Sequence, residues 1–227
     1  MTDFPFDVVA FDLDGTLADT APDLAASLNH ALGALGREGI PPESVRHLVG
    51  HGAKALLRKG LAATGEASEE LVERGFPIFL DYYGANICNG TKAYPELEAT
   101  LEALRARGVA LAICTNKPER LTHQLLEALG WSTHFDAIVG GDTLPVKKPD
   151  PAPLHEALSR AGGGRAAFVG DSIIDADAAR AAQVPFVAVS FGFSDRPIEA
   201  LGADAVIDSY SGLIEALNLI AAPPFGE

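Results

Sequence analysis

Two carboxylates follow directly on the first apolar segment of the chain. Residues Val8–Phe11 are all apolar, and Asp12, Leu13 and Asp14 come next. A carboxylate at the end of a buried segment is costly unless a cation compensates its charge, so Asp12 is a candidate for metal binding or catalysis. Because Asp14 is followed by Gly15, and Asp-Gly pairs are common in turns, the segment by itself also fits a simple turn.

Further residues capable of chemistry stand beside other apolar segments. Thr115 follows one such segment, and Lys148 lies in the stretch that precedes another. Asp171 and Asp175 come after that second segment. Each has an ordinary explanation on its own, as a strand residue, a loop lysine, or a capping or first-turn acid of a helix. Their common position beside apolar segments favours a shared site instead.

The types of these residues indicate a metal. Asp12, Asp14 and Asp171 would repel one another at a shared site, and a divalent cation is the natural relief of that repulsion. No His or Cys stands beside them in the sequence. Because ligand sets made only of oxygen favour Mg²⁺ over zinc, we expect a magnesium site.

The elements that must position these residues are predicted from short apolar segments that recur along the chain. They are Val8–Phe11, Val109–Cys114, Ala137–Val139, Ala166–Val169, Phe186–Val189 and Ala205–Ile207. Stretches of helical periodicity separate most of them; Leu97, Leu101 and Leu104, for example, fall on one helix face. Alternating strands and helices predict an α/β fold, a doubly wound parallel sheet covered on both sides. Ligands of such sheets bind beyond the carboxyl ends of the strands, where the candidate residues would meet.

One part of the chain breaks this alternation. Between residues 18 and 88 no convincing strand is expected, and the apolar pattern is helical. The stretches His47–Leu61 and Ser68–Ile87 are predicted as helices, as is the stripe formed by Leu24, Leu28, Leu32 and Leu35. The sequence therefore predicts a Rossmann-like core of residues 1–17 and 89–227, with an inserted all-helical domain of residues 18–88.

Composition excludes several classes of function. The 227 residues carry 17 Lys and Arg against 31 Asp and Glu, a formal net charge of −14. This charge is repelled by nucleic acid and by anionic membrane surfaces, so neither is an expected partner. Hydrophobic residues make up 48% of the chain, which argues against wholesale disorder.

The sequence also predicts a cytoplasmic location. Residues 1–7 lack the basic and apolar regions of a signal peptide, and no apolar run approaches the ~20 residues of a membrane span. Cys114 lies within an apolar run, so we expect it and Cys88 to be reduced thiols. The oligomeric state, monomer or homodimer, stays open.

Four segments together resemble the haloacid dehalogenase superfamily. The stretch from Phe11 to Leu17, Phe-Asp-Leu-Asp-Gly-Thr-Leu, is similar to its first motif, and Thr115 to its second. Lys148 before Pro149 is similar to the third motif, and the stretch from Gly170 to Asp175 to the fourth. The resemblance covers essentially the whole chain and implies that the helical insert is a cap closing over the site.

The resemblance also implies roles. Asp12 would attack phosphorus and form an aspartyl-phosphate, and Asp14 would protonate the leaving oxygen and then activate water. Mg²⁺ would be held by the carboxylates of Asp12 and Asp171 and by the backbone carbonyl of Asp14. Lys148 would neutralise negative charge, with Asp175 orienting it or the waters of the metal.

The phosphoryl oxygens would be bound by Thr115 and by backbone N–H groups near Leu13 and Asn116. In the same superfamily, dehalogenases lack an acid two residues after the nucleophile and ion pumps carry Thr there, so Asp14 favours a phosphatase. A hexose-phosphate mutase, a pyrophosphatase, a nucleotidase and a phosphonatase stay open as alternatives, as does a non-catalytic module that binds phosphate or metal.

Segments of the insert and its return resemble bacterial phosphoglycolate phosphatases. They are the stretches Val45–Ala53, Asp23–Ala25 and Tyr94–Leu97. This implies that the turn Gly50-His51-Gly52 dips toward the site, where His51, Arg46 or Lys54 would meet a glycolate carboxylate. The family often carries Asn at position 51 and Gly at position 96, where this chain has His and Glu. The expected substrate is thus a small phosphorylated metabolite, first of all 2-phosphoglycolate.

Overall fold

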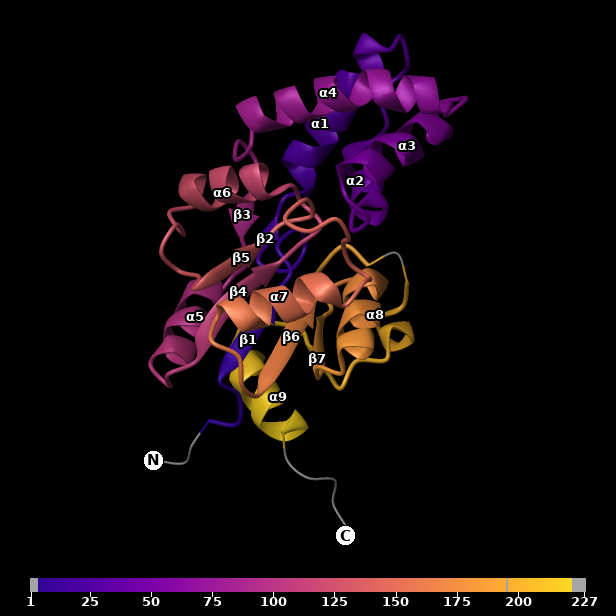
Figure 1. Cartoon of the computed structure of the whole chain (residues 1–227). Coiled ribbons are helices and arrows are strands. Elements are labelled where there is room, and N and C mark those ends of the chain that lie inside the picture. Colours follow the sequence, from indigo (N-terminus) through magenta and orange to yellow (C-terminus); the bar gives the residue numbers. More distant parts are fainter. Residues whose placement is uncertain (1–3, 195, 222–227) are drawn as a thin grey trace.

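A six-stranded parallel sheet forms the centre of the computed structural model, which describes residues 4–194 and 196–221 (Figure 1). The strand order is β5-β4-β1-β6-β7-β8. The strands are β1 (Val8–Phe11), β4 (Ala110–Cys114), β5 (Ala137–Val139), β6 (Ala166–Gly170), β7 (Phe186–Val189) and β8 (Ala205–Ile207). Every predicted strand is confirmed to within one residue at each end.

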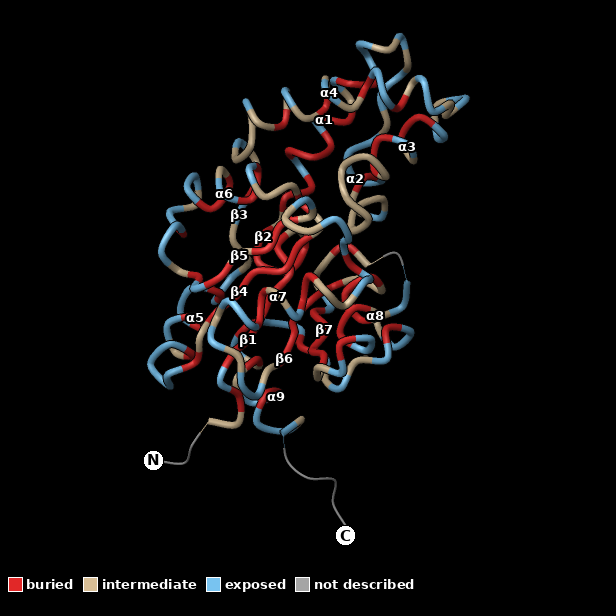
Figure 2. The backbone as a smooth tube through the Cα atoms, in the orientation of Figure 1, coloured by how far each residue is buried: buried red, intermediate tan, exposed pale blue. Residues whose placement is uncertain are grey.

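Helices cover both faces of this sheet, so both faces of the central strands are apolar. Val9 and Phe11 of β1 pack on one side with leucines of α5 (Leu97–Arg105), α6 (Glu119–Ala128) and α9 (Leu213–Ile220). Val8 and Ala10 pack on the other side with α7 (Ala152–Arg160) and α8 (Ile173–Ala182). Figure 2 accordingly shows buried residues along the strands and exposed residues along the outer faces of the helices.

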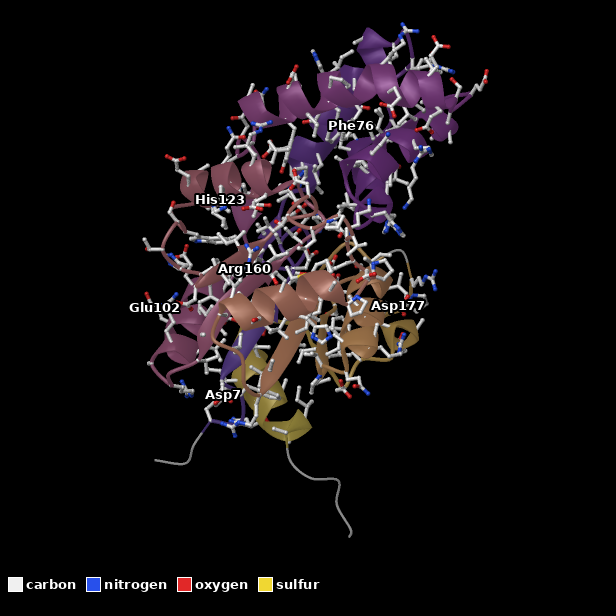
Figure 3. The ribbon with its side chains drawn as sticks, in the orientation of Figure 1. Asp7, Phe76, Glu102, His123, Arg160 and Asp177 are labelled. Atoms are coloured by element: carbon white, nitrogen blue, oxygen red, sulfur yellow. The ribbon has the colours of Figure 1, made fainter. Side chains whose placement is uncertain are left out.

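The outer faces of the helices are polar, which completes the predicted amphipathic pattern. Glu102 on α5, His123 on α6 and Arg160 on α7 are all exposed and point away from the sheet (Figure 3). Three short 3₁₀ helices, Arg46–Leu48, Ile198–Leu201 and Tyr210–Gly212, complete the helical elements. Within the described residues, no helix is both long enough and apolar enough to cross a membrane.

Four helices of the inserted segment form a third apolar cluster of their own. They are α1 (Ala21–Ala34), α2 (Pro42–Val45), α3 (Ala53–Ala63) and α4 (Glu69–Ala85). Leu28, Leu57 and Phe79 lie fully buried at its centre. Gly60 allows close packing there, because a Cβ atom on it would lie 2.7 Å from Leu28 Cδ1. The segment therefore buries its apolar residues largely within itself, beside the sheet rather than on it (Figure 1).

Two details of the inserted segment differ from the sequence prediction. The single helix expected over His47–Leu61 is wrong: the 3₁₀ helix ends at Leu48, and α3 begins at Ala53. Gly50 and Gly52 interrupt it with φ values of 109° and 88°, which belong to a turn and not to a right-handed helix.

A two-stranded ribbon is the second difference. β2 (Ala18–Asp19) pairs antiparallel with β3 (Lys92–Ala93), and neither strand was among those predicted. Two residues are too few to show a periodic pattern, so pairing between distant segments decides this element. The ribbon joins the two ends of the inserted helical segment.

Candidate active site

Neighbouring strands bring the predicted residues to one edge of the sheet. β1 lies between β4 and β6, with Phe11 level with Ile113 on one side and Val169 on the other. Asp12 follows Phe11 directly, and its N–H donates to the Val169 carbonyl at 2.9 Å. The first polar residue after each of these three strands therefore lies at the same carboxyl edge, as expected for a parallel sheet.

Three carboxylates meet at this edge. One oxygen from each of Asp12, Asp171 and Asp175 lies within 4.8 Å of the others, and all three residues are buried. Asp171 accepts from the Phe193 N–H at 2.6 Å and from Thr16 Oγ1 at 3.3 Å. Asp175 lies in the first turn of α8, where it and Ser172 form a capping box. These bonds fix the directions of Asp171 and Asp175, so the cluster is held together before any cation binds.

Burial and mutual repulsion shift the ionisation of the cluster. Burial raises the pKa of Asp12 to about 6, with Asp175 and Asp14 adding to the effect and Lys148 opposing it. Burial likewise raises the pKa of Asp171 well above its ordinary value, reinforced by Asp175 and Asp12. The site therefore holds more negative charge than its own cations balance.

Lys148 is the cation within this cluster. Its Nζ lies 2.6 Å from Asp175 Oδ1, 2.9 Å from Asp12 Oδ1 and 2.7 Å from the carbonyl oxygen of Cys114. Burial lowers the pKa of this ammonium group, but Asp12 and Asp175 outweigh burial and leave it above its ordinary value. One ammonium group thus stands against three carboxylates.

The donor set fits a divalent cation of the magnesium type. Asp12 Oδ1 is buried and forms no hydrogen bond, because the nearby Lys148 ammonium is not aligned to donate to it. The cluster offers only carboxylate oxygens, as Mg²⁺ prefers. The Asp14 carboxylate is turned elsewhere, so of the predicted metal ligands Asp14 has only its backbone carbonyl to offer.

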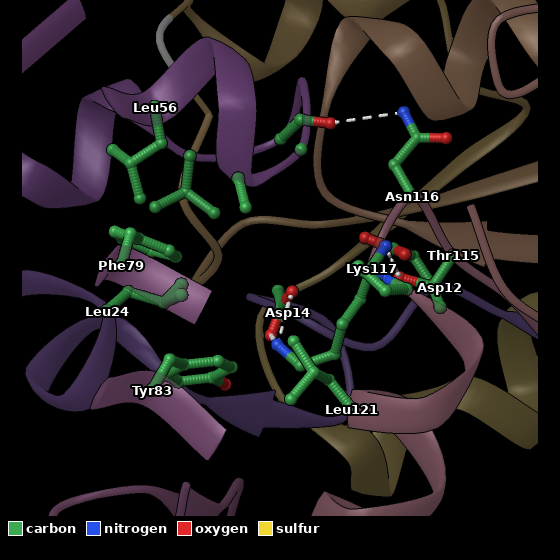
Figure 4. A pocket seen from close by; sticks show the side chains of 15 residues that line it. Asp12, Asp14, Leu24, Leu56, Phe79, Tyr83, Thr115, Asn116, Lys117 and Leu121 are labelled. Carbon is green, nitrogen blue, oxygen red and sulfur yellow. Dashed lines mark hydrogen bonds and ion pairs between the residues drawn. The ribbon is translucent and has the colours of Figure 1, made fainter. Parts of the chain in front are cut away.

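Asp14 pairs with a lysine whose role the sequence did not reveal. Lys117 Nζ lies 2.6 and 2.9 Å from the two carboxylate oxygens of Asp14, and the lysine is 4% exposed. Figure 4 shows these two contacts as dashed lines. In the sequence, Lys117 stands before a proline at the start of a predicted helix and also fits a solvated lysine. In the sequence, only the position of Lys117 two residues after Thr115 indicated that it could belong to the site.

Further hydrogen-bonding groups line the same pocket as Asp12. Thr115 is buried, and its hydroxyl accepts from the Lys117 N–H at 3.3 Å. Asn116 donates through Nδ2 to the Lys148 carbonyl at 3.0 Å and, more weakly, to the Gly50 carbonyl at 3.5 Å. In the described part of the chain, the backbone N–H groups of Leu13 and Asn116 have no acceptor, which leaves them free for an anion.

A pocket joins these residues to the inserted helices. Its core side is formed by Asp12, Asp14, Thr115, Asn116, Lys117, Pro118 and Leu121, and its cap side by Leu24, Val49, Gly50, Gly52, Ala53, Leu56, Phe79 and Tyr83 (Figure 4). The expected approach of the 50–52 turn to this region agrees with Gly50 and Gly52 lining the pocket. Polar and apolar side chains thus share one cavity.

The three predicted cap cations do not line this pocket. Arg46 pairs with Asp19 at 2.7 Å, and Lys54 pairs with Glu73 on an exposed surface. His51 contributes its backbone carbonyl, which accepts from Lys147 Nζ at 3.3 Å. Lys117 is the one positively charged side chain among the described residues that line the pocket.

Comparison with known proteins places these features in a family. Residues 9–189 match the family model of the haloacid dehalogenase-like hydrolases. The chain is 42% identical over 224 residues to the phosphoglycolate phosphatase of Caulobacter vibrioides, covering 95% of this chain and 93% of that protein. It is also 42% identical to the phosphoglycolate phosphatase of Agrobacterium fabrum, covering 96% and 95%.

A solved structure agrees with these relatives. The crystal structure of a predicted phosphoglycolate phosphatase from Haemophilus somnus superposes with a TM-score of 0.87 at 34% identity. The match covers 93% of this chain and 97% of that one. The similarity therefore extends over both the sheet and the inserted helices.

Proposed function

This chain belongs to the haloacid dehalogenase-like hydrolases, and on that premise we propose that it is a phosphatase that converts 2-phosphoglycolate and water into glycolate and phosphate. One observation supports the phosphatase chemistry above all. Asp12 is buried beside Lys148, and Asp14, two residues later, lines the same pocket. The choice of substrate is supported by relatives of that name, 42% identical over nearly the whole chain.

The reaction proceeds through two displacements at phosphorus. In the first, a carboxylate oxygen of Asp12 bonds to phosphorus, the bond from phosphorus to the glycolate oxygen breaks, and that oxygen takes a proton from the Asp14 carboxyl group. In the second, water bonds to phosphorus and gives a proton to the Asp14 carboxylate. The bond between phosphorus and Asp12 breaks, and phosphate leaves.

The surrounding residues reduce the repulsion between an anionic nucleophile and an anionic substrate. Lys148 holds a positive charge within 2.9 Å of Asp12, where phosphoryl charge accumulates. Thr115 and the N–H groups of Leu13 and Asn116 would bind the phosphoryl oxygens. Asp175 anchors Lys148 through the 2.6 Å contact and thereby positions it.

We propose Mg²⁺ as the cofactor, held by the carboxylates of Asp12 and Asp171 and by the backbone carbonyl of Asp14. When bound, it supplies positive charge that offsets the carboxylates and the phosphoryl oxygens. Asp175 lies near enough to orient waters around it.

The proposed domain boundaries lie close to the ribbon of β2 and β3. Residues 18–88 form the cap, which carries the apolar side of the pocket, and residues 1–17 and 89–227 form the catalytic core. A cytoplasmic location is proposed as well, in keeping with two cysteines that form no disulfide.

The test is phosphate release measured with Mg²⁺ over a panel of phosphoglycolate, sugar phosphates, nucleoside monophosphates and pyrophosphate. We expect phosphoglycolate to lead in kcat/KM by at least about tenfold, and Asp12→Asn to abolish all activity. Asp81→Asn, on the exposed side of α4, is the matched control. A flat profile that depends on Asp12 would retain the phosphatase and reject phosphoglycolate as its substrate.

A further inference from the structure

Lys117 lies beside Asp14, the residue to which the proposed reaction assigns the leaving oxygen of the substrate. Its Nζ is within hydrogen-bond distance of both oxygens of Asp14. In the proposed reaction Asp14 donates to the leaving oxygen, so that oxygen also lies one hydrogen bond from Asp14. Atoms attached to the leaving oxygen are therefore brought next to the Lys117 ammonium group.

The rest of this region is apolar. Leu24, Val49, Leu56, Phe79 and Leu121 line the pocket around the lysine. A carboxylate placed among such side chains is costly unless a cation or donors compensate it. Among the described residues that line the pocket, Lys117 alone supplies that cation.

Tyr83 supplies a second, independent observation. It comes from α4 of the cap, is 1% exposed, and its hydroxyl forms no hydrogen bond within the described part of the chain. Its ring lies 4.6 Å from Lys117 Nζ. A buried hydroxyl without a partner costs free energy, so this group is suited to accept or donate a hydrogen bond when a ligand arrives.

The Lys117 ammonium group also has donor capacity left. It carries three N–H groups, and its hydrogen bonds to the two Asp14 oxygens account for two. Within the described residues, the hydrogen bonds of Lys117 Nζ both go to Asp14. Figure 4 shows Lys117 reaching between Asp14 and the cap residues, with Tyr83 on the cap side.

We propose that the Lys117 ammonium group and the Tyr83 hydroxyl form a subsite for the carboxylate of the leaving group. Lys117 is then the specificity-determining residue that selects short phosphomonoesters carrying a carboxylate. The inference rests on the proposed function and names how its substrate is recognised. In this proposal Lys117 binds the carboxylate in place of the three residues expected from the sequence. Those residues, Arg46, His51 and Lys54, do not line the pocket.

The subsite favours a short leaving group. In 2-phosphoglycolate one carbon separates the leaving oxygen from the carboxylate, which keeps the carboxylate near both Asp14 and Lys117. A longer chain carries its carboxylate past the ammonium group and toward Leu24 and Phe79, where no cation compensates it.

Binding to a protein that does not turn over tests the subsite separately from the activity. The probes are 2-phosphoglycolate and 2-hydroxyethyl phosphate, in which a neutral CH₂OH group replaces the carboxylate. Calorimetry with Mg²⁺ compares the Asp12→Asn protein with Asp12→Asn/Lys117→Met. We expect the added Lys117→Met change to weaken 2-phosphoglycolate binding about 100-fold and 2-hydroxyethyl phosphate binding less than about fivefold.

Kinetics on the otherwise unaltered chain gives a second readout. Lys117→Met is expected to lower kcat/KM for 2-phosphoglycolate at least about tenfold more than for 2-hydroxyethyl phosphate, with much of the difference in KM. Lys92→Met, an exposed lysine on β3, is the matched control and should change neither value. Equal losses for both substrates would mean that Lys117 acts only through Asp14, and would overturn the subsite.

Tyr83→Phe keeps the test informative should Lys117→Met fail to fold, because it removes one oxygen and keeps the ring. In the Asp12→Asn background it should weaken 2-phosphoglycolate binding about fivefold and leave 2-hydroxyethyl phosphate binding within about twofold. No selective loss in either variant overturns the subsite. If the selective losses appear while the unaltered enzyme does not prefer 2-phosphoglycolate in turnover, the proposed function fails and the carboxylate subsite stands.

Discussion

Lys148 Nζ and Asp12 Oδ1 lie 2.9 Å apart in the interior of the site, and neither residue is more than 6% exposed. The same nitrogen contacts Asp175 at 2.6 Å, so one lysine is shared by two carboxylates. Asp171 completes the acidic cluster. We expect the balance of charge at this point to control both stability and metal binding.

Replacing Lys148 should destabilise the metal-free protein in a pH-dependent way. Lys148→Met leaves buried carboxylates without their cation, which costs about 3 kcal/mol of unfolding free energy. At pH 5 the loss should be smaller than at pH 8, because burial raises the pKa of Asp12 and of Asp171 and protonation then removes their charge. Urea unfolding in EDTA measures both values, with Lys92→Met as control. A loss of the same size at both pH values would contradict this account.

Magnesium should stabilise the protein more at high pH than at low pH. Burial raises the pKa of Asp12 to about 6, above its ordinary 3.8, so the folded metal-free protein binds a proton between these values that the unfolded chain does not. The stability from this proton is present below pH 3.8 and is lost as pH rises through about 6. Mg²⁺ needs the ionised carboxylates, so it competes with protons.

Thermal unfolding with Mg²⁺ or with EDTA at pH 5 and 7.5 measures this linkage. The rise in Tm on adding Mg²⁺ should be several degrees at pH 7.5 and at most about half as large at pH 5. In Asp12→Asn, which cannot ionise at this position, the difference between the two pH values should shrink. An equal rise in Tm at both pH values would argue against Asp12 as a ligand.

Replacing Asp14 should separate the two displacements. Asp14→Asn removes the group that we propose protonates the leaving oxygen and activates water, so kcat for an alkyl phosphate should fall about 10²- to 10⁴-fold. A phenolic leaving group, such as that of p-nitrophenyl phosphate, departs without a proton. With that substrate the first displacement should persist, and the aspartyl-phosphate should accumulate.

Intact-protein mass spectrometry after rapid mixing detects the added phosphoryl group. We expect a substantial phosphorylated fraction in Asp14→Asn, little in the unaltered enzyme, and none in Asp12→Asn/Asp14→Asn. If Asp14→Asn turned over p-nitrophenyl phosphate as fast as the unaltered enzyme, Asp14 would not be required for the second displacement.

A further buried aspartate, outside the acidic cluster, should matter for stability rather than catalysis. Asp23 on α1 is 4% exposed and accepts from the N–H groups of Gly90 and Thr91 and from the Thr91 hydroxyl. It thereby ties the first cap helix to the segment that returns to the core. Asp23→Ala leaves these donors without an acceptor and should cost about 3 kcal/mol.

Asp23→Asn keeps one acceptor oxygen, so its free energy of unfolding should fall less than that of Asp23→Ala. Asp81→Asn should not change the free energy of unfolding measurably. Urea unfolding gives all three values. If Asp23→Ala unfolds at the same urea concentration as the unaltered protein, this tie between cap and core contributes nothing.

The sequence by itself determined the sheet and the gathering of Asp12 and Asp171. Runs of Val, Ile and Phe such as Val8–Phe11 have one stable place, a strand covered on both faces. Parallel strands end at a common edge, so residues that follow them meet whatever the details of packing. Asp12 and Asp171 were therefore identified from local pattern alone.

Only the tertiary structure decided the role of Lys117 and the course of the 50–52 turn. Lys117 pairs with a residue 103 positions away and lies over a cap tyrosine, and no local pattern reports whether a lysine before a proline is solvated or enclosed. The helical pattern through His47–Leu61 continued across Gly50 and Gly52, yet their positive φ values break the helix. Periodicity records which side chains are apolar, whereas burial of a charge and the path of a glycine turn depend on what distant segments bring into contact.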